Sequence, residues 1–199
     1  MSINVNTIVL PPTVPTQIVT AVLATNNENA TKQAVLDPTG LLLAYKSINK
    51  SFGSVGFSSN ATVTTITTVN TFVLVQNSAY TLNTLSQNFA LTAGATQASS
   101  RLTYQGATTC NVRVTCTSNV FVAGSNNQNI SIQLFLNGVA VPNTVGKSWL
   151  QTAPHPQNQS VTTLLTMNTN DYVELFVANN TANNNVTVAD TTVDAVSLH

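Results

Sequence analysis

The sequence offers few side chains that could act as nucleophiles, bases or metal ligands. Its two cysteines, Cys110 and Cys116, lie six residues apart on one face of an alternating segment. In an extended chain this spacing is about 20 Å, far beyond the ~7 Å over which a disulfide can join two Cα atoms. We therefore expect both cysteines to be buried as small apolar residues, and a zinc site would lack further cysteine ligands.

The histidines and carboxylates are equally poor candidates for catalysis. His155 lies in a proline-flanked loop and His199 is the last residue. Asp190 and Asp194 share one face of a strand, but about 13 Å of extended chain separates them, too far for a glycosidase pair on one strand. Asp171 follows an Asn- and Thr-rich triplet, where a turn or capping role is expected. The sequence predicts that the protein is not an enzyme; the alternative is a site shared between subunits.

Two further features could bind a ligand. The Asn-rich stretch 179–185 could offer oxygens to calcium, but most of them are neutral amide oxygens, which bind calcium weakly. Trp149 could stack on a sugar, although a lone tryptophan in a β-protein more often belongs to a core or an interface. No glycine-rich loop followed by lysine is present to hold a phosphate. We expect no metal and no cofactor.

Charge is scarce and balanced. Charged residues make up 6% of the chain, with six basic and six acidic side chains, while Asn and Thr together supply about three residues in ten. This composition lacks the basic surface of nucleic-acid-binding proteins and the polybasic patch that binds membranes. The first residues also lack the charged and apolar regions of a signal peptide, and no apolar run approaches the ~20 residues of a membrane span. We expect no secretion by a signal peptide and no contact with nucleic acid or membrane.

The chain divides into an arm, residues 1–52, and a body, residues 53–199. Three prolines within five residues forbid a helix or a central strand at the start of the arm, which must be extended there. This segment is apolar and uncharged, which favours a role as an anchor to a neighbouring protein. Its proposed anchor residues are Ile8, Val9, Leu10, Pro11, Pro12, Val14 and Pro15.

The body has the pattern of an all-β protein. Short Thr- and Val-rich segments are separated by clusters of Gly, Asn, Pro or Ser, which predicts an antiparallel sandwich or barrel. Between Cys110 and Cys116 every second residue is apolar, as in a half-buried strand, and Asn137–Gly138 predicts a hairpin turn. The expected strands are 62–67, 71–76, 87–92, 100–105, 109–122, 129–137, 148–151, 160–167, 172–178 and 186–198.

Three aromatic residues fall on the strand faces that should point away from the core. They are Phe135 in one strand, and Tyr172 and Phe176 in another. Fully burying one such ring is worth about 1.5–3 kcal/mol, so three rings could drive assembly of subunits. The alternative is that the arm packs over them, and the residue pattern alone leaves both interpretations open.

Several segments resemble viral and phage jelly-roll domains of the tumour-necrosis-factor (TNF) and complement-globular-head type. The similar segments span about two thirds of the chain, and they are Asn60–Ile66, Arg101–Gly106, Ile132–Gly138, Asn170–Val177 and Val186–Leu198. The resemblance implies a ten-stranded antiparallel jelly roll that forms a homotrimer, with Tyr172 and Phe176 near the threefold axis. It therefore favours a subunit interface at Phe135, Tyr172 and Phe176 over cover by the arm. Viral members of this type sit on the virion as decorations, spikes, fibre heads or receptor-binding tips. The arm has no counterpart in the resemblance.

We therefore expect a structural protein of the virion: a trimeric decoration, spike or fibre component that the arm docks on other capsid or tail proteins. One alternative is a fibre-tip module that binds a host-surface receptor or glycan, with Trp149 as a contact. A second alternative is a minor or shell subunit of the capsid. The scarcity of basic residues argues against a shell subunit whose arm contacts the genome.

Overall fold

The computed structural model describes residues 6–8, 19–21, 30–36, 42–77, 81–82, 85–93, 100–153 and 155–198, with backbone alone for residues before Lys50 and for Ala93 and Ser100. The chain separates into two compact units, Met1–Lys50 and Ser51–His199. Every element in the described residues is a β-strand, and none of these residues forms a helix long and apolar enough to span a membrane.

The N-terminal unit contains two antiparallel strand pairs. Strand β1 (Asn6–Ile8) pairs with β2 (Val19–Ala21), and β3 (Ala30–Leu36) pairs with β4 (Leu42–Asn49). Ile8 thus belongs to extended chain, as the prolines that follow it predict. The other proposed anchor residues, Val9, Leu10, Pro11, Pro12, Val14 and Pro15, lie outside the described residues.

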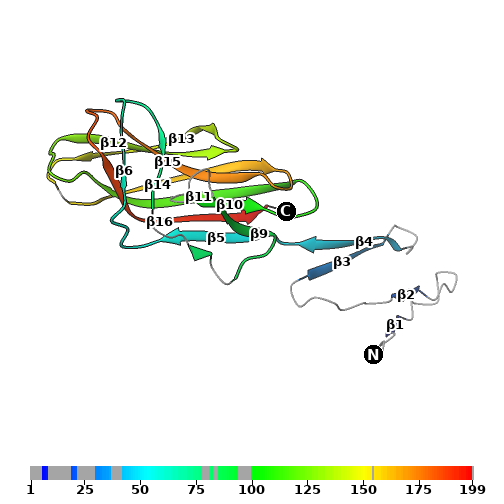
Figure 1. Ribbon diagram of the computed structural model, residues 1–199. Helices are drawn as coiled ribbons and strands as arrows, with labels where there is room; N and C mark the ends of the chain where they lie inside the picture. Colours follow the sequence, from blue (N-terminus) through cyan, green and yellow to red (C-terminus); the bar gives the residue numbers. More distant parts are fainter. Residues whose placement is uncertain are drawn as a thin grey trace. The chain divides into compact units, whose positions relative to one another are not determined.

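The body consists of two antiparallel sheets that pack face to face (Figure 1). The first sheet has the order β13-β12-β15-β10-β9, with β7 also paired to β15. Its strands are β7 (Val73–Leu74), β9 (Phe89–Ala93), β10 (Ser100–Tyr104), β12 (Gln128–Leu136), β13 (Val139–Leu150) and β15 (Tyr172–Asn179).

The second sheet has the order β14-β11-β16-β5-β8, with β6 also paired to β16. Its strands are β5 (Phe52–Phe57), β6 (Val63–Thr64), β8 (Thr81–Leu82), β11 (Cys110–Phe121), β14 (Gln157–Met167) and β16 (Val186–Ser197). The chain crosses repeatedly between the two sheets, as in a jelly roll. The predicted all-β antiparallel jelly-roll sandwich is confirmed. In the described body, each sheet has five strands in its main order, and two short strands, β6 and β7, pair beside them.

Alternating side chains build the core between the sheets. On β12, Ile130, Ile132 and Leu134 are fully buried, and on β11 the buried side chains include Val114 and Cys116. These are the faces that the alternation predicts. The other side of each sheet therefore forms an outer face, and any function of the body must involve these faces or the loops.

The hairpin between β12 and β13 forms where it was expected. Asn137 and Gly138 both have positive φ, 53° and 77°, the conformation that makes Asn-Gly favourable in a two-residue hairpin turn. Strand β13 then continues to Leu150, whereas a separate strand over 148–151 was expected. A register shift between Gln133 and Phe135 marks an irregularity in the pairing of β12 with β13. Strand β13 therefore continues through Pro142–Asn143–Thr144 without ending there.

Candidate functional site

The carboxylates and histidine considered for catalysis have structural roles or stand alone. Asp190 accepts hydrogen bonds from Ser59 N (3.0 Å) and Asn119 Nδ2 (3.1 Å). Asp171 accepts one from Asn168 N at 2.7 Å, which is the expected turn interaction. His155 is exposed in its loop. Across the described residues, no group of three or more His, Cys, Asp or Glu side chains could hold a metal ion.

Both cysteines are free, in agreement with their spacing. Cys116 is fully buried, and its thiol lies 3.5 Å from Ser118 Oγ and 3.7 Å from Thr191 Oγ1. Burial raises the pKa of the Cys116 thiol, which disfavours the reactive thiolate. Cys116 therefore acts as a core residue.

The Asn-rich loop uses its amides to hold itself together. The Asn179 carboxamide oxygen accepts hydrogen bonds from Thr181 N (2.9 Å) and Ala182 N (3.2 Å). Its Nδ2 donates to Gln128 Oε1 at 3.0 Å and to Asn184 O at 3.1 Å. Asn179 is fully buried, so these bonds satisfy a polar group that would otherwise be costly to bury. The loop oxygens considered for calcium are thus partly engaged within the protein.

The three predicted interface residues do lie together on one outer face, that of the first sheet. Phe135 and Phe176 stack with ring centroids 3.7 Å apart, and Phe72 approaches Phe135 at 6.2 Å. We call Phe72, Phe135 and Phe176 the aromatic cluster. Each of its rings is half-buried within the subunit. Much of the cover for these rings thus comes from neighbouring rings of the same subunit, one of them Phe72, which lies in the expected strand 71–76.

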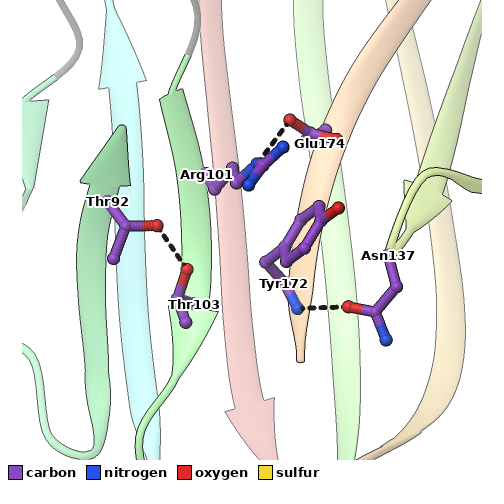
Figure 2. A network of polar contacts seen from close by, with 6 residues as sticks. All are labelled: Thr92, Arg101, Thr103, Asn137, Tyr172 and Glu174. Atoms are coloured by element: carbon purple, nitrogen blue, oxygen red, sulfur yellow. Dashed lines mark hydrogen bonds and ion pairs between the residues drawn. The ribbon is translucent and has the colours of Figure 1, made fainter. Parts of the chain in front are cut away.

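Tyr172 belongs to an adjoining polar network on the same face (Figure 2). The Arg101 guanidinium lies 3.9 Å from the centroid of the Tyr172 ring, and Arg101 Nε donates to Glu174 Oε1 at 2.8 Å. Beside Arg101, the hydroxyl groups of Thr92 and Thr103 form a hydrogen bond of 2.6 Å. The Glu174 side chain is 3% exposed and that of Arg101 23%. A guanidinium placed over a ring and paired with a buried carboxylate gives this face a fixed, nearly neutral surface.

Replacing Glu174 with alanine should destabilise the subunit by about 2 kcal/mol. The loss of one partner leaves the Arg101 charge unpaired, and partial exposure of Arg101 moderates the ~3–5 kcal/mol cost seen for fully buried pairs. Urea unfolding of the purified protein measures this difference. The double variant Arg101→Met/Glu174→Leu, which leaves no unpaired charge, should recover most of the loss. A Glu174→Ala stability within about 0.5 kcal/mol of wild type would show that the pair contributes little.

The outer face of the second sheet carries apolar side chains with greater exposure. Leu164 on β14, Arg113 on β11, Val196 on β16 and Phe52 on β5 are cross-strand neighbours in one line. We call these four residues the exposed row. Leu164 is 67% exposed and Val196 42%, and Leu198 at the end of the same face is 44% exposed. Such a contiguous line is typical of a surface that a partner covers.

A shallow hollow of about 410 Å³ adjoins the exposed row. Its lining includes Phe52 and Val196 together with two opposite charges, Arg113 and Asp194. Asp194 pairs in register with Thr115, two residues along β11 from Arg113, so the two charges are diagonal neighbours on one face. Within the described residues Arg113 and Asp194 form no ion pair. The hollow thus offers one cation and one anion within an otherwise apolar and hydroxyl-rich surface.

Trp149 lies on β13, on the outer face of the first sheet, and is 51% exposed. Its cross-strand partner is Asn129 on β12, and Lys147 lies two residues before it on the same face. The structure therefore places Trp149 in neither the core nor the aromatic cluster.

The strand order defines the class of this body, an antiparallel jelly-roll sandwich. It is similar to PRD1 vertex protein P5, with a TM-score of 0.50 and 11% identity over 75% of this chain and 97% of that chain. Eiger TNF from S. frugiperda (TM-score 0.44, 11% identity, 75% and 94%) and murine APRIL (0.45, 9%, 74% and 99%) are also similar. The sequence matches no protein-family model and no curated protein. At these identities the likeness is one of fold, and it agrees with the resemblance to viral jelly rolls in the sequence motifs.

Proposed function

We propose that the protein is a non-enzymatic structural component of a virion, whose jelly-roll body forms a homotrimer and whose N-terminal unit docks it on capsid or tail. The observation that carries this proposal is the likeness of the body to PRD1 vertex protein P5. The match covers 97% of the chain of that protein. The low charge and the amide- and hydroxyl-rich composition also support it, because such a surface has few groups to screen or titrate as the medium changes.

The exposed row is the surface we propose for the contact between subunits. In the isolated subunit Leu164 and Val196 are exposed, at 67% and 42%, whereas Phe135, Tyr172 and Phe176 already pack against neighbours of their own chain. Covering the exposed row therefore removes more apolar area from water, which favours it as the contact. The interface at Phe135, Tyr172 and Phe176 stays a prediction and is the rival location on the opposite sheet.

Charge complementarity supports a second copy as the occupant of the exposed row. Arg113 and Asp194 each lack an ionic partner within the described residues. In a closed ring of identical subunits, two different patches of each copy meet across every contact. Arg113 of one copy can then pair with Asp194 of the next, so both charges are neutralised on assembly.

Reversing either charge should weaken the trimer by about tenfold or more, equivalent to roughly 1.4 kcal/mol. Arg113→Asp places two acidic groups at the contact, and Asp194→Arg places two basic groups there. The double variant Arg113→Asp/Asp194→Arg restores opposite charges and should restore assembly. Sedimentation equilibrium of the purified variants measures the association constants.

A double variant that assembles no better than the two single variants would contradict the pairing across the contact. Urea unfolding of each variant is the necessary control, since these surface charges should change the stability of the subunit itself by no more than about 0.5 kcal/mol.

The N-terminal unit is the proposed anchor. Its residues Ile8–Pro15 are uncharged, proline-rich and apolar except for Thr13, and extended chain of this kind can add a strand to an exposed sheet edge of a neighbouring protein. The partner is then another capsid or tail protein, and the protein's location is the virion. Copy number per particle separates this role from that of a shell subunit, which would be present in far more copies.

A further inference from the structure

The single tryptophan of the chain is presented on a rigid strand rather than buried. Trp149 is 51% exposed, although large aromatic side chains are on average highly buried. Its backbone is fixed by the β12–β13 ladder, where it lies directly opposite Asn129. Cross-strand partners bring their Cβ atoms to within about 5 Å, so the side chains of Asn129 and Trp149 leave the sheet next to each other.

The amides next to Trp149 are held in place by their own hydrogen bonds. Asn180 Nδ2 donates to Ser131 Oγ at 2.6 Å and to Asn129 Oδ1 at 3.3 Å. The backbone N–H groups are also fixed, with Asn129 N donating to Thr181 Oγ1 at 2.9 Å and Asn180 N to Asn129 O at 2.8 Å. These bonds orient both carboxamides before any ligand arrives, which reduces the entropy cost of binding.

Each carboxamide keeps one polar group available. Among the hydrogen bonds between described residues, Asn129 Nδ2 donates none and Asn180 Oδ1 accepts none. Both side chains are half-exposed. The surface therefore presents a donor and an acceptor near an apolar ring, and the exposed Lys147 side chain lies on the same face. A pyranose sugar matches this arrangement, since one face of its ring carries C–H groups and its rim carries hydroxyls.

We propose that Trp149, Asn129 and Asn180, with Lys147 beside them, form a binding site for a pyranose residue of a glycan. The apolar face of the sugar stacks on the indole, and its hydroxyls accept from Asn129 Nδ2 and donate to Asn180 Oδ1. The site lies on the sheet opposite the exposed row, so a trimer built through that row leaves it open. Each trimer would carry three copies of this weak site. Together they would strengthen attachment to a glycan-covered surface by avidity.

Because Trp149 is the only tryptophan, its fluorescence reports directly on this site. The full-length protein is titrated with methyl glycosides of mannose, galactose and N-acetylglucosamine and with N-acetylneuraminic acid, and is applied in parallel to a glycan array. We expect a saturable change of fluorescence with at least one sugar and array binding to glycans that carry it.

On the array, Trp149→Ala should weaken that binding by about tenfold or more, and Asn129→Ala or Asn180→Ala should weaken it measurably. Val139→Ala, a change at an exposed apolar residue elsewhere on β13, is the matched control and should leave binding unchanged. If Lys147→Ala weakens binding, the bound sugar is acidic. If Lys147→Ala leaves the affinity unchanged, the bound sugar is neutral.

Absence of binding to every sugar and array glycan, or array binding that survives Trp149→Ala, would overturn the proposal. A Trp149→Ala variant that changes from trimer to monomer would also overturn it, because Trp149 would then be a subunit contact. The mass of the wild-type protein is measured in the same experiment. A wild-type monomer that binds sugar through Trp149 would contradict the proposed assembly while leaving the glycan site intact.

Discussion

Leu164→Asp and Val196→Asp should each convert the proposed trimer largely to monomers. Both side chains are exposed in the subunit, at 67% and 42%, and would be covered when the exposed row meets a second copy. An aspartate there would bury a charge in the contact, and because it would lie directly across the strands from Arg113 it would also compete with Asp194 of the next copy for that guanidinium, at a combined cost of about 3 kcal/mol. Association should therefore weaken by roughly a hundredfold for each substitution. Size-exclusion chromatography with light scattering at micromolar concentration measures the outcome.

The chain provides a closely matched control for this experiment. Val139, beside the hairpin turn on the other sheet, is 69% exposed, so Val139→Asp makes the same kind of change at similar exposure. It should leave the trimer intact. If the contact lay at the predicted aromatic residues instead, Tyr172→Ser would dissociate the trimer while Leu164→Asp would not, and that result would contradict the role of the exposed row.

Deleting residues 1–49 should leave a folded trimer that no longer attaches to virus particles. The core of the body lies entirely within Ser51–His199, and Ser51 N donates to Ser197 Oγ at 2.9 Å, so the cut removes no core residue. Attachment should fall to background because the proposed anchor is gone. Cosedimentation of the purified protein with particles that lack their own copy measures attachment.

Smaller changes within the N-terminal unit refine this test. Replacing Val9 and Leu10 with serine removes apolar area but keeps the length of the chain and its prolines, and should weaken attachment substantially. The body variant Leu164→Asp serves for comparison, because it alters assembly and leaves the anchor intact. Undiminished attachment of the chain that lacks residues 1–49 would rule out the docking role of this unit.

Much of the body could be predicted from the alternation of apolar and polar residues. The segments around Val112 and Ile132 show a clear two-residue period, and the structure buries the predicted faces. Strand β5 was missed because its sequence, Phe-Gly-Ser-Val-Gly-Phe, contains two glycines, which strands normally avoid. The structure explains Gly53: an added Cβ would come within 2.4 Å of Phe89 Cβ, so the close approach of β5 to its neighbour requires glycine.

The candidate surfaces were predictable in part. Strand parity placed Phe135, Tyr172 and Phe176 on an outer face, but it could not show that Arg101 covers Tyr172, because that contact joins segments far apart in the chain. The same parity could have identified Leu164. It did not, because Leu164 is followed by Leu165 and two successive leucines leave open which of them faces the core.

Native mass spectrometry of the full-length protein at micromolar concentration tests the central claim most directly. A homotrimeric component of the virion should give a mass three times that of the 21.0 kDa chain. That species should separate into single chains when Leu164 is replaced with aspartate. A wild-type protein that gives the mass of one chain under these conditions would contradict the account.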